Sequence, residues 1–180
     1  MPSRPASHFG LVAVGLAVSG VLLLGIPASA AAQDPVATAA TSRAAADTAE
    51  VRAAVVAMFD AMRAADTAAM RAAFLPGAPL ISAGYRDGAA RLDTANFDDF
   101  LASIANAKLR DPDVQLDERL GRTVIEMDDP LASVWTEYEF WVGDRFSHCG
   151  VDAIHMLRTA DGWRIVQVVD TRRREGCTGH

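Results

Sequence analysis

The sequence has little positive charge, few cysteines and only 180 residues. It contains one lysine, Lys108, and its 17 Lys and Arg residues are outnumbered by 23 Asp and Glu residues, so the formal net charge is −6. This balance argues against nucleic acid as a partner, because polyphosphates are bound through positive charge. Two cysteines are too few for a disulfide-rich scaffold or a four-cysteine zinc site, but they suffice for one disulfide. The length predicts one domain and excludes a multidomain protein.

A hydrophobic segment near the N-terminus predicts export. One basic residue, Arg4, precedes an uninterrupted run of small and apolar residues from Leu11 to Ile26, and the small-x-small sequence Ala28-Ser29-Ala30 follows. The run is shorter than the roughly 20 residues that a transmembrane helix needs, and its flanks are typical of a secretory signal peptide. We predict a signal peptide over residues 1–30, cleaved after Ala30 or Ala32, with an uncleaved membrane anchor as the alternative. The mature protein is then expected in the periplasm or outside the cell, without a stable membrane anchor.

The predicted compartment bears on the two cysteines. Outside the cytoplasm thiols tend to oxidise, so Cys149 and Cys177 are expected to form a structural disulfide. Such a bridge would contribute roughly 3 to 4 kcal/mol by closing a loop of the unfolded chain. A redox-active pair is disfavoured because the two residues do not have the C-x-x-C spacing.

The remaining chain divides into a leader and one domain. Residues 31–46 are rich in alanine, threonine and polar side chains and are predicted to be a flexible leader. Residues 47–177 are predicted to be the domain. Its apolar residues recur at helical spacing after Asp47, after Asp66 or Thr67, and from about Thr94 to Lys108.

Strands dominate the second half of the predicted domain. Leu80–Tyr85 predicts a short strand before the third helix. From residue 114 onward the apolar period becomes two, which predicts strands over residues 114–116, 123–127, 131–142, 146–157 and 163–171, with a bend at Gly121. Because helices come first and an antiparallel meander follows, the predicted fold class is α+β.

Alternation in the strand over residues 131–142 separates two faces. Tyr138 and Phe140 share one face, which suits a pocket or core. Trp135 and Trp141 share the other face with two glutamates, which suits a dimer interface, a covering segment or plain partial burial.

The next strand carries the candidate polar residues. His148 and Asp152 lie on one of its faces and His155 on the other, so the two strand histidines cannot build a common metal site, and no metal is predicted. A three-residue turn over Val142-Gly143-Asp144 would place Tyr138 opposite His148 and on the face of Asp152, whereas a two-residue turn would reverse this. His148 and Asp152 are roughly 13 Å apart along the strand, so they can flank a ligand but cannot form a direct pair. Local hydrogen bonding at the sheet rim is the alternative for both.

The C-terminal charges leave two interpretations open. Arg172, Arg173 and Arg174 form either a basic patch for an anionic partner or a solvated edge paired with acidic side chains. Asp170 reaches the pocket only if the register of its strand agrees, and the Asp161-Gly162 turn leaves that register ambiguous by one residue.

Two segments carry a resemblance to a known superfamily. They are FDAMRAADTAAMRAAF, residues 59–74, and the more specific run from Leu131 to Cys177, which includes Ser147-His148-Cys149-Gly150. With the order of elements, they resemble the nuclear transport factor 2-like superfamily, in particular its SnoaL-like and lumazine-binding proteins. The resemblance implies a cone-shaped fold with three N-terminal helices packed on the concave face of a curved, mostly antiparallel sheet, a pocket between them, and frequent homodimers. It does not imply one function, because the fold hosts enzymes and binding modules alike.

These observations lead to three functional hypotheses. The first is a non-catalytic binding module whose pocket takes a small apolar or aromatic molecule and is lined by Met58, Met62, Tyr85, Phe97, Tyr138, Phe140, His148 and Asp152. The second is an isomerase, dehydratase or cyclase that needs no cofactor, with Asp152 as general base and His148 or Tyr138 as acid. The third is a dimeric interaction domain that uses the face of Trp135 and Trp141.

Overall fold

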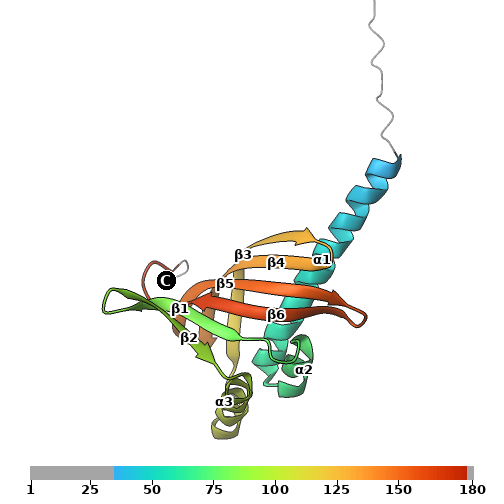
Figure 1. Ribbon diagram of the computed structural model, residues 1–180. Helices are drawn as coiled ribbons and strands as arrows, with labels where there is room; N and C mark the ends of the chain where they lie inside the picture. The colour runs from blue at the N-terminus through green and yellow to red at the C-terminus, as the bar shows by residue number, and fades with distance from the viewer. Residues whose placement is uncertain (1–34, 178–180) are drawn as a thin grey trace, which may run out of the picture. The chain divides into compact units, whose positions relative to one another are not determined.

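The structure is a computed structural model that describes residues 35–177, with side chains from residue 42 onward (Figure 1). The predicted signal peptide and the first residues of the predicted leader lie outside this range. Helices and strands follow one another as α1 (Pro35–Ala64), α2 (Thr67–Ala73), β1 (Leu80–Arg86), β2 (Ala89–Ala95), α3 (Phe97–Arg110), β3 (Leu116–Asp128), β4 (Leu131–Val142), β5 (Arg145–Thr159) and β6 (Gly162–Thr171).

The six strands form one sheet in the order β2-β1-β6-β5-β4-β3. All neighbouring strands are antiparallel except β1 and β6, which run parallel over four residue pairs beginning at Leu80 and Val168. Figure 1 shows α1 crossing one face of the sheet formed by β3–β6. The predicted α+β class, with N-terminal helices on a mostly antiparallel sheet, is confirmed.

The first helix begins at Pro35, inside the predicted leader, instead of at Asp47. Alanine has the highest helix propensity and proline fits the first helical position, so the alanine-rich stretch can extend the helix without burying anything. Residues 42–46 are exposed, and burial starts at Val51. The boundary between leader and domain at residue 46 stays a prediction.

Two other differences concern strands. β2 was not predicted, because all seven of its residues are exposed and no apolar alternation marks it. The predicted strands over residues 114–116 and 123–127 are one strand, β3, whose pairing with β4 shifts between Leu120 and Thr123. Gly121 therefore marks a bulge, and the chain does not break there.

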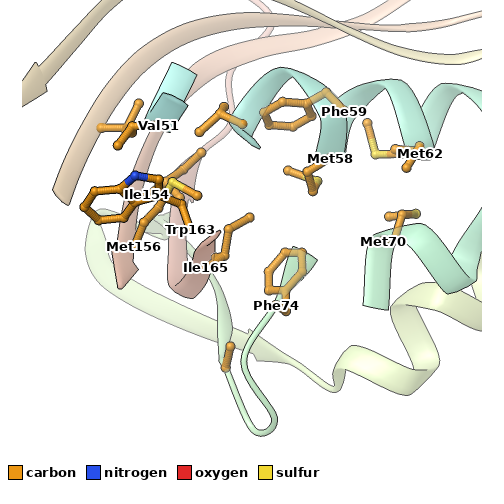
Figure 2. Packing of buried hydrophobic residues seen from close by; sticks show 14 of the residues in the cluster. Val51, Met58, Phe59, Met62, Met70, Phe74, Ile154, Met156, Trp163 and Ile165 are labelled. Atoms are coloured by element: carbon orange, nitrogen blue, oxygen red, sulfur yellow. The ribbon is translucent and has the colours of Figure 1, made fainter. Parts of the chain in front are cut away.

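The apolar core fills one end of the space between helices and sheet. Val51, Met58, Phe59 and Met62 of α1 face Ile154 and Met156 of β5 and Trp163 and Ile165 of β6 (Figure 2). Met70 of α2 and Phe74, the residue directly after α2, lie beside them. Met70, Ile154 and Ile165 are completely buried, and each such side chain contributes about 1.5–3 kcal/mol. The core uses the second half of β5 and the first half of β6, so it leaves the opposite ends of these strands to line a cavity.

A disulfide ties the chain end to the sheet. Cys149 of β5 is bonded to Cys177, as predicted, and the two Cα atoms are 5.9 Å apart. Beside the bridge, Cys149 and Arg173 exchange two backbone hydrogen bonds of 2.9 Å each. The segment after β6 is therefore held along β5.

Candidate functional site

A cavity of about 740 Å³ lies between the helices and the inner face of the sheet. This volume is within the range of small-molecule sites. Its apolar wall comes mainly from Met58, Met62, Phe74, Phe100, Ile104 and Phe140. Its polar side chains on the sheet side include Glu118, Tyr138, His148, Asp152, Asp170 and Arg172. On the side of α3, polar residues line the cavity at exposed positions: Asn96, Asp99, Ser103 and Arg110. The buried and half-buried polar side chains therefore gather on the sheet side, which forms the floor of the cavity.

A bulge in β5 decides which side chains reach the floor. The turn after β4 has two residues, since Val142 pairs with Arg145, and this turn alone would put Tyr138 and His148 on opposite faces. Trp141 pairs with Phe146, however, while Phe140 pairs with His148, so Ser147 is an extra residue in β5. The extra residue reverses the parity again. Tyr138 and His148 consequently face the same cavity.

Three carboxyl groups meet on the floor from three strands. Asp152 of β5 lies directly opposite Asp170 of β6, and Glu118 reaches the site from β3. Asp152 is only 3% exposed. Arg172 donates a hydrogen bond of 2.6 Å from Nε to Oδ2 of Asp170. One of the three carboxylates is thus neutralised by a salt bridge.

The other two carboxyl groups are coupled. Burial raises the pKa of Glu118 well above its usual range, and the negative charge of Asp152 raises it further. Burial raises the pKa of Asp152 to about 7, and a hydrogen bond with Glu118 opposes that rise. Two adjacent buried carboxylates repel each other strongly when both are charged. The pair therefore holds at least one proton at neutral pH, and Glu118 can donate its proton to Asp152.

Tyr138 and His148 are both uncharged at neutral pH. Burial, followed by the charges of nearby acids, raises the pKa of Tyr138 far above its usual value, and its hydroxyl donates to the carbonyl oxygen of Thr171 at 2.9 Å. Burial, followed by the positive charge of Arg172, lowers the pKa of His148. The His148 ring packs edge-on against Tyr138, with ring centroids 5.7 Å apart. The hydroxyl proton of Tyr138 is thus already engaged in a hydrogen bond within the protein.

Six of the eight predicted pocket residues line the cavity: Met58, Met62, Tyr138, Phe140, His148 and Asp152. Tyr85 does not, and it is 83% exposed. Only Leu80–Ala83 of β1 pair with β6, so the rest of the β1–β2 hairpin extends past the sheet and carries Tyr85 away. Phe97 is also outside the lining, because as the first residue of α3 it packs on Phe74, the residue directly after α2, with ring centroids 4.6 Å apart.

Three charged residues of the floor were not among the predicted pocket residues. Glu118 is two residues from the buried Leu116, so both side chains lie on the same face of β3. Alternation along this strand was the sequence signal that would have placed Glu118 in the pocket. The sequence left open which face of its strand Asp170 occupies. An irregularity between His155 and Met156 in the pairing of β5 with β6 sets the register of Asp170. Arg172 lines the cavity, is exposed and pairs with Asp170, so this arginine fits the interpretation of a solvated edge paired with acidic side chains and not that of a basic patch.

The described residues show neither a metal centre nor a membrane span. Within residues 35–177, no three His, Cys, Asp or Glu side chains are arranged to hold a metal ion. In the same range, no helix is long and apolar enough to cross a bilayer.

An α+β fold whose helices enclose a cavity on a mostly antiparallel sheet defines the nuclear transport factor 2-like (NTF2-like) class. The profile of the family described as "Putative lumazine-binding" matches residues 46–169, and the chain belongs to this family. No curated protein matches the chain significantly.

Solved structures support the fold. An NTF2-like protein with a cystatin-like fold from Novosphingobium aromaticivorans has a TM-score of 0.62 and 16% identity, over 81% of this chain and 94% of that chain. A protein described as a "putative dehydratase" of the NTF2-like family from Streptomyces avermitilis has a TM-score of 0.55 and 17% identity, over 71% of this chain and 96% of that chain. A protein of unknown function from Mycobacterium tuberculosis has a TM-score of 0.58 and 15% identity, over 81% and 79% of the two chains. At these identities the likeness extends to the fold alone.

Proposed function

We propose that this protein is an exported, non-catalytic binding module that takes a small, mainly apolar or aromatic molecule into its cavity. The observation that carries the proposal is the cavity of about 740 Å³ beside a fully packed core. Protein interiors normally leave few voids larger than a water molecule, so an opening of this size beside tight packing favours a ligand site. The N-terminal sequence and the Cys149–Cys177 disulfide support export.

The composition of the cavity lining supports a mainly apolar or aromatic ligand. The methionines of α1 and the rings of Phe74, Phe100 and Phe140 offer a broad apolar surface. Methionine side chains adapt to irregular shapes, so Met58 and Met62 suit an aromatic body. The polar floor then orients one polar end of the ligand.

Filling the cavity is expected to abolish ligand uptake. N-phenyl-1-naphthylamine, a neutral dye that fluoresces in apolar surroundings, should bind to the mature protein. Ala107→Trp places a large side chain in the cavity from α3 and should weaken dye binding at least about tenfold. Fluorescence titration measures both affinities.

The matched control is Ala102→Trp, which adds the same side chain at an exposed position of the same helix. It should bind the dye like the unsubstituted protein. Equal binding by all three proteins, or no binding by the unsubstituted protein, contradicts the proposal.

A cofactor-independent isomerase, dehydratase or cyclase is the second candidate. The observation that favours it is the buried carboxyl pair, in which Asp152 has a pKa raised to about 7 beside a protonated Glu118. A base with a pKa near the working pH and a neutral acid beside it suit proton transfer in an apolar cavity. The fold shared with the dehydratase-like structure of S. avermitilis is compatible with this activity. His148, which is uncharged, would orient the substrate or act as the acid.

Enzymatic proton transfer is testable with 2-tetralone, an aromatic ketone with acidic α protons. In D₂O the active protein should accelerate α-proton exchange, followed by NMR, and Asp152→Asn should reduce the rate about 10²-fold or more. Asp128→Asn, at an exposed position of β3, should not change it. Exchange at the same rate with and without protein argues for the binding module.

A homodimer is the proposed assembly. On the outer face of the sheet Trp135 is 51% exposed, and its pairing partner Val124 is 37% exposed. This apolar pair supports an interface of two sheets. Trp141 contributes less, because Arg119 lies over its ring at 4.4 Å and Phe146 packs against it.

A further inference from the structure

The floor of the cavity holds more negative than positive charge. Glu118, Asp152 and Asp170 come together from β3, β5 and β6, and Arg172 is the basic side chain that joins them among the described cavity residues. Arg172 already pairs with Asp170. Arg110 of α3 also lines the cavity and is exposed like Arg172, and among the described residues no salt bridge joins it to Glu118 or Asp152. The Glu118–Asp152 pair is thus left without a cation of its own.

Asp152 is the group that most needs a partner. It is 3% exposed, and its Oδ2 atom accepts no hydrogen bond from any protein N–H or hydroxyl group of the described residues. Tyr138 and His148, which line the same cavity, have other partners: Tyr138 donates to Thr171, and His148 is paired through Nδ1 with Ser147 at 3.0 Å. A buried acceptor without a donor costs about 1–3 kcal/mol. Within the carboxyl pair, a proton shared with Glu118 offsets this cost.

A cationic group can replace that proton. A protonated nitrogen supplies two or three N–H donors and one positive charge, which is what two adjacent carboxylates lack. The apolar wall of α1 and α3 faces the pair across the cavity, so a ligand with an apolar body can bury this nitrogen at the floor. Desolvation of the cation is offset only if both carboxylates accept from it.

We propose that the ligand of the cavity carries a protonated amine or amidine on an apolar body, and that this cation displaces the proton shared by Glu118 and Asp152. The proposal rests on the binding function given above. The balance is at least one proton released to the solvent for each cation bound, since both carboxyl groups are ionised in the complex and at most one is ionised without it. The cation and the proton therefore compete, and affinity rises with pH until the empty pair has lost its proton.

Matched indoles test the class of ligand. Tryptamine is a cation, 3-ethylindole has the same ring without the amine, and indole-3-propionate is an anion. At pH 7 tryptamine should displace N-phenyl-1-naphthylamine at about tenfold lower concentration or less than 3-ethylindole does. Indole-3-propionate should be the weakest of the three, because its carboxylate meets the acidic floor.

Calorimetry tests the proton balance independently of the dye. Tryptamine binding is measured at pH 7 in phosphate and in Tris, whose heats of ionisation differ. The difference should correspond to the release of about one to two protons per tryptamine bound, because the pair holds at least one proton at this pH. The affinity should be lower at pH 6 than at pH 8.

Two substitutions place the cation at the floor. Asp152→Asn and Glu118→Gln should remove the preference for tryptamine over 3-ethylindole and the proton release, while dye binding is retained. Asp128→Asn is the control, because Asp128 is an exposed acid of β3 outside the cavity lining, and it should leave the preference and the proton release unchanged. Asp99→Asn tests the mouth of the cavity, which Asp99 lines from α3 at an exposed position.

The outcomes separate the two proposals. Dye binding with equal displacement by tryptamine and 3-ethylindole overturns the cationic ligand and leaves the binding function in place. A preference for tryptamine that survives Asp152→Asn but not Asp99→Asn also overturns it, since the cation then binds at the mouth. Absence of binding for the dye and for all three indoles overturns both.

Discussion

Gly150→Ala is expected to destabilise the protein by about 3 kcal/mol or more. A Cβ atom at this position would lie 1.8 Å from the carbonyl oxygen of Thr171 and 2.8 Å from Cε1 of Tyr138. The first of these neighbours is backbone, so it cannot rotate away as a flexible side chain does. The end of β6 would have to move off β5, with loss of the hydrogen bond from Tyr138 to Thr171. Urea unfolding followed by tryptophan fluorescence measures the change.

The matched control is Gly84→Ala in β1. A Cβ atom there meets no other atom within 4 Å, and the substitution should change the free energy of unfolding by less than about 0.5 kcal/mol. A Gly150→Ala protein as stable as the Gly84→Ala protein would show that the end of β6 does not lie against Gly150 in solution.

Removal of the disulfide is expected to cost about 3–4 kcal/mol of unfolding free energy. Cys177→Ser opens a loop with a sequence separation of 28 residues, which restores conformational entropy to the unfolded chain. Cys177 is only partly buried, so the substitution itself removes little packing. Thermal and urea unfolding of Cys177→Ser and of the unsubstituted protein, with and without reductant, measure the effect.

The bridge also has a local effect on the site. In Cys177→Ser the backbone pairing of Cys149 with Arg173 should open more often, so the amide protons of both residues should exchange faster. Glu175→Ser, an exposed substitution in the same segment, is the control and should change neither stability nor exchange. If Cys177→Ser, with or without reductant, is as stable as the oxidised unsubstituted protein, the bridge does not constrain the unfolded chain.

Strands with one buried face were the easiest elements to predict. β4 has the predicted bounds, because its residues alternate between the core and the outer face along its length. β2 escaped prediction because it is exposed on both faces and is held by pairing with β1 alone. The helix start at Pro35 escaped for a related reason, since a stretch that buries nothing has no hydrophobic period.

The candidate site depended on registers that the sequence left open. The common face of His148 and Asp152 follows from their even spacing and was predicted. Their convergence with Tyr138 needed both the two-residue turn and the bulge at Ser147, neither of which has a clear sequence signal. The prediction that Tyr85 lines the pocket was wrong, because the sequence does not show that β1 extends beyond the residues that pair with β6.

The sequence by itself determined the α+β class, the resemblance to NTF2-like proteins and the apolar faces that pack together, because these follow from local periodicity and composition. The disulfide partner was determined by elimination, since the chain has only two cysteines. Only the tertiary structure decided that Glu118, Asp152 and Asp170 meet on one floor. Their meeting depends on pairing between strands far apart in the chain, and a shift of one residue in any of these strands would turn a carboxyl group to the other face.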